Sequence, residues 1–162
     1  MNPEALRLAH ARNDTHGGPG LTTYQRNPAR AHEIGAIGEY AIAKRYGFPM
    51  PRLRASGGDD GWDFLMYLPH GIVMRIDAKT FRNPNKLLVR VDTVKKAASN
   101  VYIMVHCDAR DCAHIIGWEF RSVVARAPIG NFALGPNHFI ASNRLRPMCD
   151  FDRLHAMRIE HV

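Results

Sequence analysis

The stretch GWDFLMYLPHGIVMRIDAKT, residues 61–80, decides the fold of this chain because it predicts a β-hairpin. Two apolar runs rich in β-branched and aromatic residues flank the turn-forming tripeptide Pro69-His70-Gly71. Each predicted strand also carries an acid, Asp63 in the first and Asp77 in the second, and Lys79 follows two residues later. These charges are either ordinary charges of an edge strand or the groups of a functional site.

The geometry of the predicted hairpin brings these charged groups together. With a three-residue turn, Leu68 lies opposite Ile72, and the same register places Asp63 opposite Asp77. Side chains alternate between the two faces of a strand, so Asp77 and Lys79 project from one face. We therefore expect one patch to hold both carboxylates and the lysine.

A pair of acids and a lysine in this arrangement is suited to phosphate chemistry with a metal ion. Two carboxylates opposite each other across a strand pair repel, and a divalent cation between them would turn that repulsion into coordination. Mg²⁺ takes oxygen ligands, commonly one or two protein carboxylates, and keeps waters or binds phosphate as well. A neighbouring lysine can orient or deprotonate a bound water, or neutralise charge at the phosphorus.

Residues 30–48 are predicted to form a helix that ends at Gly47. The residues expected on its buried stripe, with three-and-four spacing, are Ile34, Ile37, Gly38, Ala41 and Arg45. Glu39 lies on a flank of that stripe, near the boundary of the expected core. The helix precedes the hairpin and adds a third acid to the region.

The remaining pattern predicts an α/β or α+β domain, with a central mixed sheet of about four to five strands flanked by helices. After the hairpin, strands are expected at 86–91, 101–107, 113–118 and 138–142, and short helices or turns at 92–100, 119–127 and 150–160. Residues 31–162 form one domain in this interpretation. Residues 1–30 form a polar basic arm, either a partly ordered tail or a segment that touches an anionic polymer.

Composition predicts a folded protein with an anionic partner. The chain has 162 residues, of which 46% are hydrophobic and 23% charged, and its net charge is +7. Six of these seven charges lie between Lys44 and Lys96, around the hairpin. Three cysteines fit a reducing compartment, and neither a signal peptide nor a membrane-spanning stretch is recognisable, so we expect a cytoplasmic protein.

Three segments together resemble the PD-(D/E)xK nuclease superfamily. They are IGAIGEYAIAKRYG, GDDGWDF and MRIDAKT, at 34–47, 58–64 and 74–80. The chain is most similar to the small stand-alone members common in phages and prophages, which are related to Holliday-junction resolvases and restriction endonucleases. The later IIGW and RLRPM segments also look like this group, so the resemblance covers roughly residues 33–148.

The resemblance implies a restriction-endonuclease-like core and hydrolysis of phosphodiester bonds in DNA, dependent on Mg²⁺ or Mn²⁺. By position, Asp63 would be the first acidic metal ligand and Asp77 the second, with the Ala78 carbonyl as a further ligand. Lys79 would be the catalytic lysine, and Glu39 the helix acid that reaches the metal directly or through water. Many relatives are dimers, so a homodimer is left open.

Two departures from the family pattern concern the acids. No proline precedes Asp63, and Asp77 stands where glutamate is commoner. Asp59 and Asp60 are rivals for the first acid, but Asp63 is expected inside the strand and is therefore preferred. An alternative function is a catalytically silent module of this fold that binds nucleic acid or a protein partner.

Other charged and metal-ligating residues give weaker predictions. Arg75, Arg82 and Lys86 lie close to the hairpin in sequence and are candidates for contacts with the phosphate backbone of DNA. No base-reading motif is recognisable. The segment HCDARDCAH, 106–114, suggests a zinc-stabilised interaction protein, but its spacing is not that of a standard zinc finger, and a hairpin with half-buried cysteines is the simpler interpretation.

Overall fold

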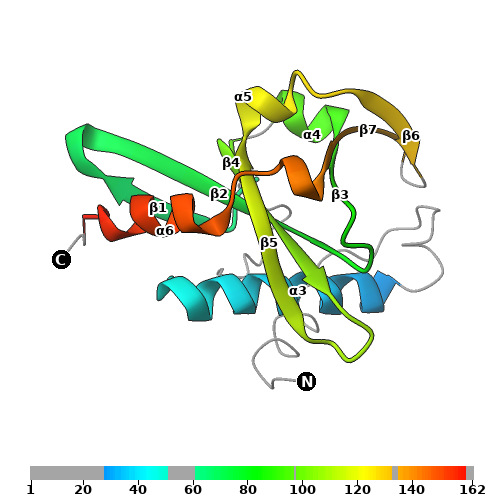
Figure 1. Cartoon of the computed structure of the whole chain (residues 1–162), viewed down its shortest axis with the longest axis horizontal. Coiled ribbons are helices and arrows are strands. Elements are labelled where there is room, and N and C mark those ends of the chain that lie inside the picture. Colours follow the sequence, from blue (N-terminus) through cyan, green and yellow to red (C-terminus); the bar gives the residue numbers. More distant parts are fainter. Residues whose placement is uncertain (1–27, 51–60, 97, 133–134, 160–162) are drawn as a thin grey trace.

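The computed structural model describes residues 28–50, 61–96, 98–132 and 135–159. It is an α+β protein with a mixed four-stranded sheet and a second, three-stranded sheet (Figure 1). The predicted basic arm, apart from residues 28–30, and both Asp59 and Asp60 lie outside the described residues. None of the described helices combines the length and the apolarity that a bilayer crossing requires.

The described helices and strands follow the chain in an order that places the hairpin directly after the long helix. They are α3 (Pro28–Tyr46), β1 (Phe64–Leu68), η1 (Pro69–Gly71), β2 (Ile72–Phe81), β3 (Lys86–Arg90), α4 (Val91–Lys96), β4 (Val101–Cys107), β5 (Ala113–Phe120), α5 (Arg121–Val124), β6 (Ile129–Phe132), β7 (Gly135–Ala141), η2 (Ser142–Arg144) and α6 (Met148–Ala156).

The predicted hairpin and its register are confirmed. β1 pairs antiparallel with β2, with Leu68 opposite Ile72 and Phe64 opposite Ile76. His70 and Gly71 reverse the chain with φ angles of 62° and 73°. This left-handed conformation costs a glycine little, which explains why the turn falls on the Pro-His-Gly tripeptide.

The four-stranded sheet has the order β1-β2-β4-β5, and only β2 and β4 are parallel. β2 is twice as long as β1 and changes partner along its length. Residues 72–76 pair with β1, whereas residues 76–81 pair with β4. Beyond Ile76, therefore, β2 has a strand on one side and has passed the end of β1 on the other.

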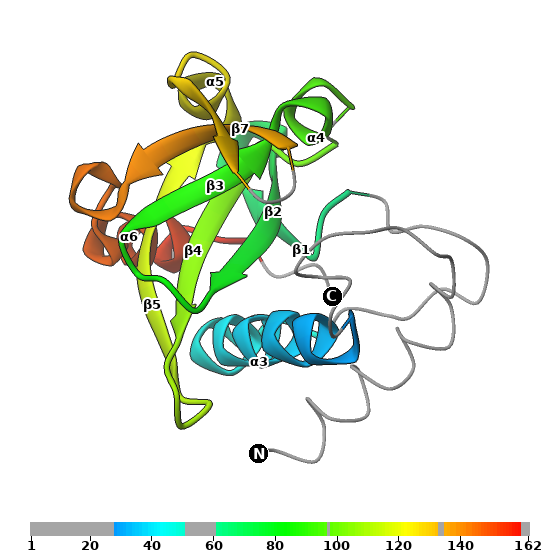
Figure 2. The same ribbon diagram turned by 90° about the vertical axis from the view of Figure 1, so that its right-hand side faces the viewer.

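Apolar residues cover both faces of this sheet. One cluster joins the sheet to α3 and α6, and a second joins it to α4, α5, β3 and β7. The alternating residues of β4 enter both, Ile103 the first and Tyr102 the second, which explains why 101–105 is apolar throughout. Figures 1 and 2 show α3 on one side of the sheet and α4, α5 and the three-stranded sheet on the other.

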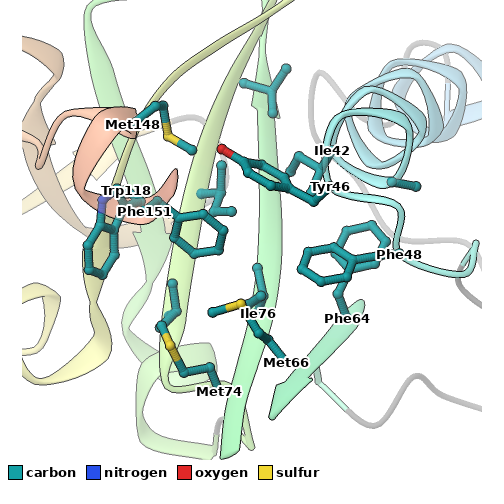
Figure 3. Packing of buried hydrophobic residues seen from close by; sticks show 14 of the residues in the cluster. Ile42, Tyr46, Phe48, Phe64, Met66, Met74, Ile76, Trp118, Met148 and Phe151 are labelled. Atoms are coloured by element: carbon teal, nitrogen blue, oxygen red, sulfur yellow. The ribbon is translucent and has the colours of Figure 1, made fainter. Parts of the chain in front are cut away.

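The first cluster holds the hairpin against the helices (Figure 3). Phe151 of α6 packs edge-on against Tyr46 of α3 and Trp118 of β5, with ring centroids 5.1 and 5.5 Å apart. Phe48 stacks on Phe64 at the start of β1, with centroids 5.4 Å apart. The beginning of the hairpin is thereby fixed next to the end of α3.

Two sequence predictions about the fold are wrong. The strand at 86–91 does not join the central sheet: β4 takes the place beside β2, and β3 pairs with β7 in a separate sheet of order β3-β7-β6. β6 was not predicted.

The second wrong prediction concerns the buried stripe of α3. Arg45, expected on that stripe, is exposed and pairs with Asp152 at 3.0 Å. Tyr46 is buried instead, because α6 covers it.

Gly38 sets how closely α3 approaches β2. A Cβ atom at this position would overlap the Thr80 hydroxyl and would lie 3.0 Å from the Thr80 Cβ. The Thr80 hydroxyl oxygen is itself buried and has no hydrogen-bond partner among the described residues. The absence of a side chain at Gly38 therefore brings the neighbouring Glu39 close to the hairpin.

We expect Gly38→Ala to destabilise the protein by about 1–3 kcal/mol, because the added methyl group pushes α3 away from β2. Helix propensity alone predicts the opposite, a gain of about 1 kcal/mol. Urea unfolding measures the difference. Combining G38A with Thr80→Ala, which removes the overlapping hydroxyl and methyl group, should restore much of the loss; a G38A variant more stable than the wild type contradicts this packing argument.

Candidate active site

Asp77 and Lys79 form an ion pair on one face of β2. The Lys79 ammonium lies 2.7 Å from Oδ2 of Asp77, and the Asp77 side chain is only 9% exposed. Their neighbours Ile76 and Ala78 pack into the cluster beneath α3. Because side chains alternate, Asp77 and Lys79 project from the other face, toward α4 and the three-stranded sheet.

Asp63 lies at the edge of β2, where β1 ends. It precedes β1 by one residue rather than lying inside the strand as predicted. Its N–H donates to the Ile76 carbonyl at 2.7 Å, and its Oδ2 accepts a hydrogen bond from the Ala78 N–H at 2.7 Å. The carboxylate thus takes the place that a backbone carbonyl of a longer β1 would have taken.

The Ala78 carbonyl belongs to the same edge. In a strand, the N–H and C=O of one residue project toward the same neighbour, and the Ala78 N–H points to Asp63. The backbone of Arg75, three residues earlier, instead points to the β4 side. There its carbonyl accepts a hydrogen bond from the Asn100 N–H, and its N–H donates to Oδ1 of Asn100. The geometry is therefore compatible with the Ala78 carbonyl and the Asp63 carboxylate facing one ion.

Glu39 approaches from α3, on the opposite face of the sheet from Asp77. It is 4% exposed and lies within the buried side of the helix, between Ile42 and the close contact at Gly38, rather than on its flank as predicted. Its negative charge helps to raise the pKa of Asp63. Asp63, at the strand edge, is thus the acid that interacts with both Glu39 and Asp77.

Burial and the neighbouring acids raise the pKa of Asp63 well above its usual range. Burial is the main cause, and the charges of Glu39 and Asp77 add to it, while the Ala78 N–H and Lys79 act in the opposite direction. The charges of Glu39 and Asp77 thus oppose ionisation of Asp63, whereas the charge of Lys79 favours it. A cation at this edge would relieve that repulsion.

Lys79 stays protonated at neutral pH. Burial acts to lower its pKa, but the charge of Asp77 and the hydrogen bond to it, followed by the charge of Asp63, outweigh burial and raise the pKa. A lysine that holds its proton so firmly is suited to neutralising a phosphate or orienting a water. It is poorly suited to deprotonating that water.

The donors at the edge of β2 fit a magnesium-type ion better than a closed metal cage. Among the described residues, no group of three or more His, Cys, Asp or Glu side chains is arranged to hold a metal ion. Mg²⁺ needs only one or two protein carboxylates and fills its other positions with water and phosphate oxygens. Asp63 and Asp77, with the Ala78 carbonyl, supply this kind of donor set.

The three candidate phosphate-contacting residues differ in their surroundings. Arg75 is exposed and shares a face of β2 with Asp77. Arg82 donates to the Asp108 carbonyl and pairs with Asp111 at 2.5 Å, so it ties the end of β2 to the β4–β5 turn. The Lys86 ammonium lies 5.1 Å from the ring centroid of Phe139. Arg75 is thus the best placed of the three to meet a substrate.

The cysteines and histidines of 106–114 do not form a zinc site within the described part of the chain. Cys107 is fully buried and Cys112 is exposed, so the two thiols face different surroundings. His114 contacts Asp108 at 3.3 Å. These contacts hold the turn between β4 and β5, as expected for an ordinary hairpin.

No protein family, curated protein or solved structure matches this chain in sequence or structure comparisons.

Sequence reasoning missed the groups that β4 contributes. Tyr102 lies directly opposite Asp77 in the parallel pairing of β2 and β4 and projects from the same face. Ser99, just before β4, and Arg121 are close enough to act on its hydroxyl. The alternating pattern of β4 predicts which face Tyr102 occupies, but only the strand order places it beside Asp77.

We expect Asp63→Asn to stabilise the metal-free protein at pH 7 and to raise its melting temperature by a few degrees. The amide oxygen can still accept from the Ala78 N–H, whereas the charge that repels Glu39 and Asp77 is gone. Because the folded state of the wild type binds the Asp63 proton more tightly than the unfolded chain, wild-type stability falls as pH rises from about 4 toward the raised folded-state pKa.

Thermal unfolding between pH 4 and 8 without metal tests this expectation. The advantage of D63N over the wild type should shrink as the pH falls toward 4, where the wild-type carboxyl takes up its proton. A D63N variant less stable than the wild type at pH 7 would show that the Asp63 charge is favourable to folding.

Proposed function

We propose that this protein is a Mg²⁺- or Mn²⁺-dependent endonuclease that hydrolyses phosphodiester bonds in DNA. The observation that carries the proposal is the meeting of the Asp77–Lys79 ion pair with the Asp63 carboxylate at the edge of β2. Asp63, Asp77 and Lys79 are the proposed catalytic groups. Glu39 assists from α3 by its charge on Asp63.

Each group has a role that follows from its surroundings. Asp63 and Asp77, with the Ala78 carbonyl, would hold the metal ion. When bound, such an ion polarises a phosphate and lowers the pKa of a bound water. Lys79 stays charged next to Asp77 and neutralises negative charge on the phosphate or orients the attacking water.

The arrangement of elements also supports a restriction-endonuclease-like core. A long helix packs closely against a hairpin, and the second strand of that hairpin continues in parallel with the next strand of the sheet. The concentration of positive charge around the hairpin favours a polyanion as substrate.

The central test is cleavage of supercoiled plasmid, single-stranded and branched DNA with Mg²⁺ or Mn²⁺. We expect Asp77→Asn and Lys79→Gln each to lower the cleavage rate by about 10²–10³-fold, because each removes a charge beside the reacting phosphate. Glu39→Gln should have a smaller effect, about tenfold, because Glu39 acts through Asp63. Asp152→Asn is the matched control: it removes an exposed acid that pairs with Arg45 and should leave cleavage unchanged.

Two results contradict the proposal. If the wild type cuts none of these substrates, or if D77N cuts as fast as the wild type, the edge of β2 is not a nuclease site. Salt-dependent DNA binding without cleavage or metal binding would instead support the second candidate, a module of this fold that binds without cutting.

Arg75 and Arg82 offer a paired test of how the protein contacts DNA. We expect Arg75→Ala to weaken DNA binding similarly for all sequences and to reduce the slope of log affinity against log salt by about 1, with stability unchanged. Arg82→Ala should instead destabilise the fold by up to about 1 kcal/mol, because it loses Asp111 and the Asp108 carbonyl. Fluorescence anisotropy at several salt concentrations, with urea unfolding, separates the two; equal salt slopes for R75A and wild type contradict the assignment.

A further inference from the structure

A buried polar layer lies behind the Asp77–Lys79 pair. Tyr102 of β4 is completely buried and pairs directly with Asp77 in the parallel register. Burial raises the pKa of its phenol, the Ser99 hydroxyl acts in the opposite direction, and the charges of Asp77 and Lys79 act on it as well. Tyr102 thus belongs to the apolar cluster, while its hydroxyl lies within range of the charges of Asp77 and Lys79.

The hydroxyls of Tyr102 and Ser99 are buried without a hydrogen-bond partner of ordinary geometry among the described residues. Such buried polar atoms are rare, because an unsatisfied hydroxyl forfeits its bonds to water. The fold could have avoided the cost with a phenylalanine, which fills the same volume. The cost suggests that the hydroxyl acquires its partner in another state of the site.

The Asp77–Lys79 ion pair indicates that this other state is the one in which Asp77 binds a cation. Lys79 donates to Oδ2 of Asp77 at 2.7 Å. If Asp77 turns that oxygen toward a cation, the Lys79 ammonium loses an acceptor inside a largely buried site. A buried ammonium needs a replacement acceptor, and the Tyr102 hydroxyl is a neutral acceptor on the same face of the sheet.

We propose that Tyr102 is a positioning residue. When Asp77 binds a divalent cation, the Tyr102 hydroxyl, oriented by Ser99, accepts a hydrogen bond from the Lys79 ammonium. This inference rests on the proposed function. With the cation bound, this hydrogen bond holds the Lys79 ammonium at a fixed position, so that it neither moves with the Asp77 carboxylate nor turns toward solvent.

The test compares Tyr102→Phe with the wild type in the absence and presence of Mn²⁺. Without metal, the melting temperature of Y102F should stay within about 2 °C of the wild type, because the hydroxyl makes no hydrogen bond of ordinary geometry, Ser99 included, among the described residues. With Mn²⁺, we expect about tenfold weaker binding by calorimetry and a smaller rise in melting temperature. In cleavage assays, kcat should fall about tenfold while KM stays unchanged, because Tyr102 is buried away from the substrate.

Two further variants make the result specific. Ser99→Ala should give the same pattern with a smaller, few-fold effect, because it only frees the Tyr102 hydroxyl. Tyr46→Phe is the matched control, since it also removes one tyrosine hydroxyl, but that hydroxyl donates to Oδ1 of Asp152 at 2.8 Å between α3 and α6. Y46F should lose stability without metal and keep wild-type Mn²⁺ affinity and kcat.

The outcomes separate this inference from the function on which it rests. A wild type that binds Mn²⁺ and cuts DNA, with Y102F equal to it in both, overturns the role of Tyr102 alone. A Y102F variant already destabilised without metal also overturns it, because the hydroxyl then has a structural partner. A wild type that neither binds Mn²⁺ nor cuts overturns the proposed function and, with it, this inference.

Discussion

The unequal length of β1 and β2 is the constraint on which the candidate site depends. β1 covers β2 only as far as Ile76, and β4 pairs with β2 from that residue onward. The strand therefore enters the interior of the sheet with one edge no longer paired to β1. The Asp63 carboxylate takes over the hydrogen bond of the Ala78 N–H at this point. Charged groups can gather there because the edge is buried and, within the described residues, no further strand pairs with it.

Packing on both faces fixes this edge and so determines its electrostatics. α3 is drawn onto β2 at Gly38, and the aromatic contacts of Phe151 and Phe48 hold the helix end and the start of the hairpin together. Within this frame, burial and then the charges of Glu39 and Asp77 raise the pKa of Asp63, and the charge of Asp77 and the hydrogen bond to it raise the pKa of Lys79 against the effect of burial. The packing thus determines how close these ionisable groups lie to one another.

The local part of this arrangement could be predicted from the sequence, and the long-range part could not. Turn length and alternation gave the register of the hairpin, because both are set by residues close in the chain. The same alternation identified the buried side of β3 but could not say which sheet it joins. Tyr102 was missed because its place beside Asp77 depends on the parallel pairing of β2 and β4, which no local pattern encodes. Glu39 lies deeper than expected because the rotation of α3 is set by Gly38 and by α6 rather than by its apolar spacing.

The negative charge of Asp63 is the strongest reason to regard the edge as a functional site rather than a structural feature. As an acceptor for the Ala78 N–H, an uncharged amide oxygen would serve equally well. Burial and the charges of Glu39 and Asp77 oppose ionisation of Asp63 and raise its pKa. Capping the Ala78 N–H therefore accounts for a polar side chain at this position but does not by itself require an ionisable one. A cation between the carboxylates accounts for both, since it needs the charge and tolerates the hydrogen bond.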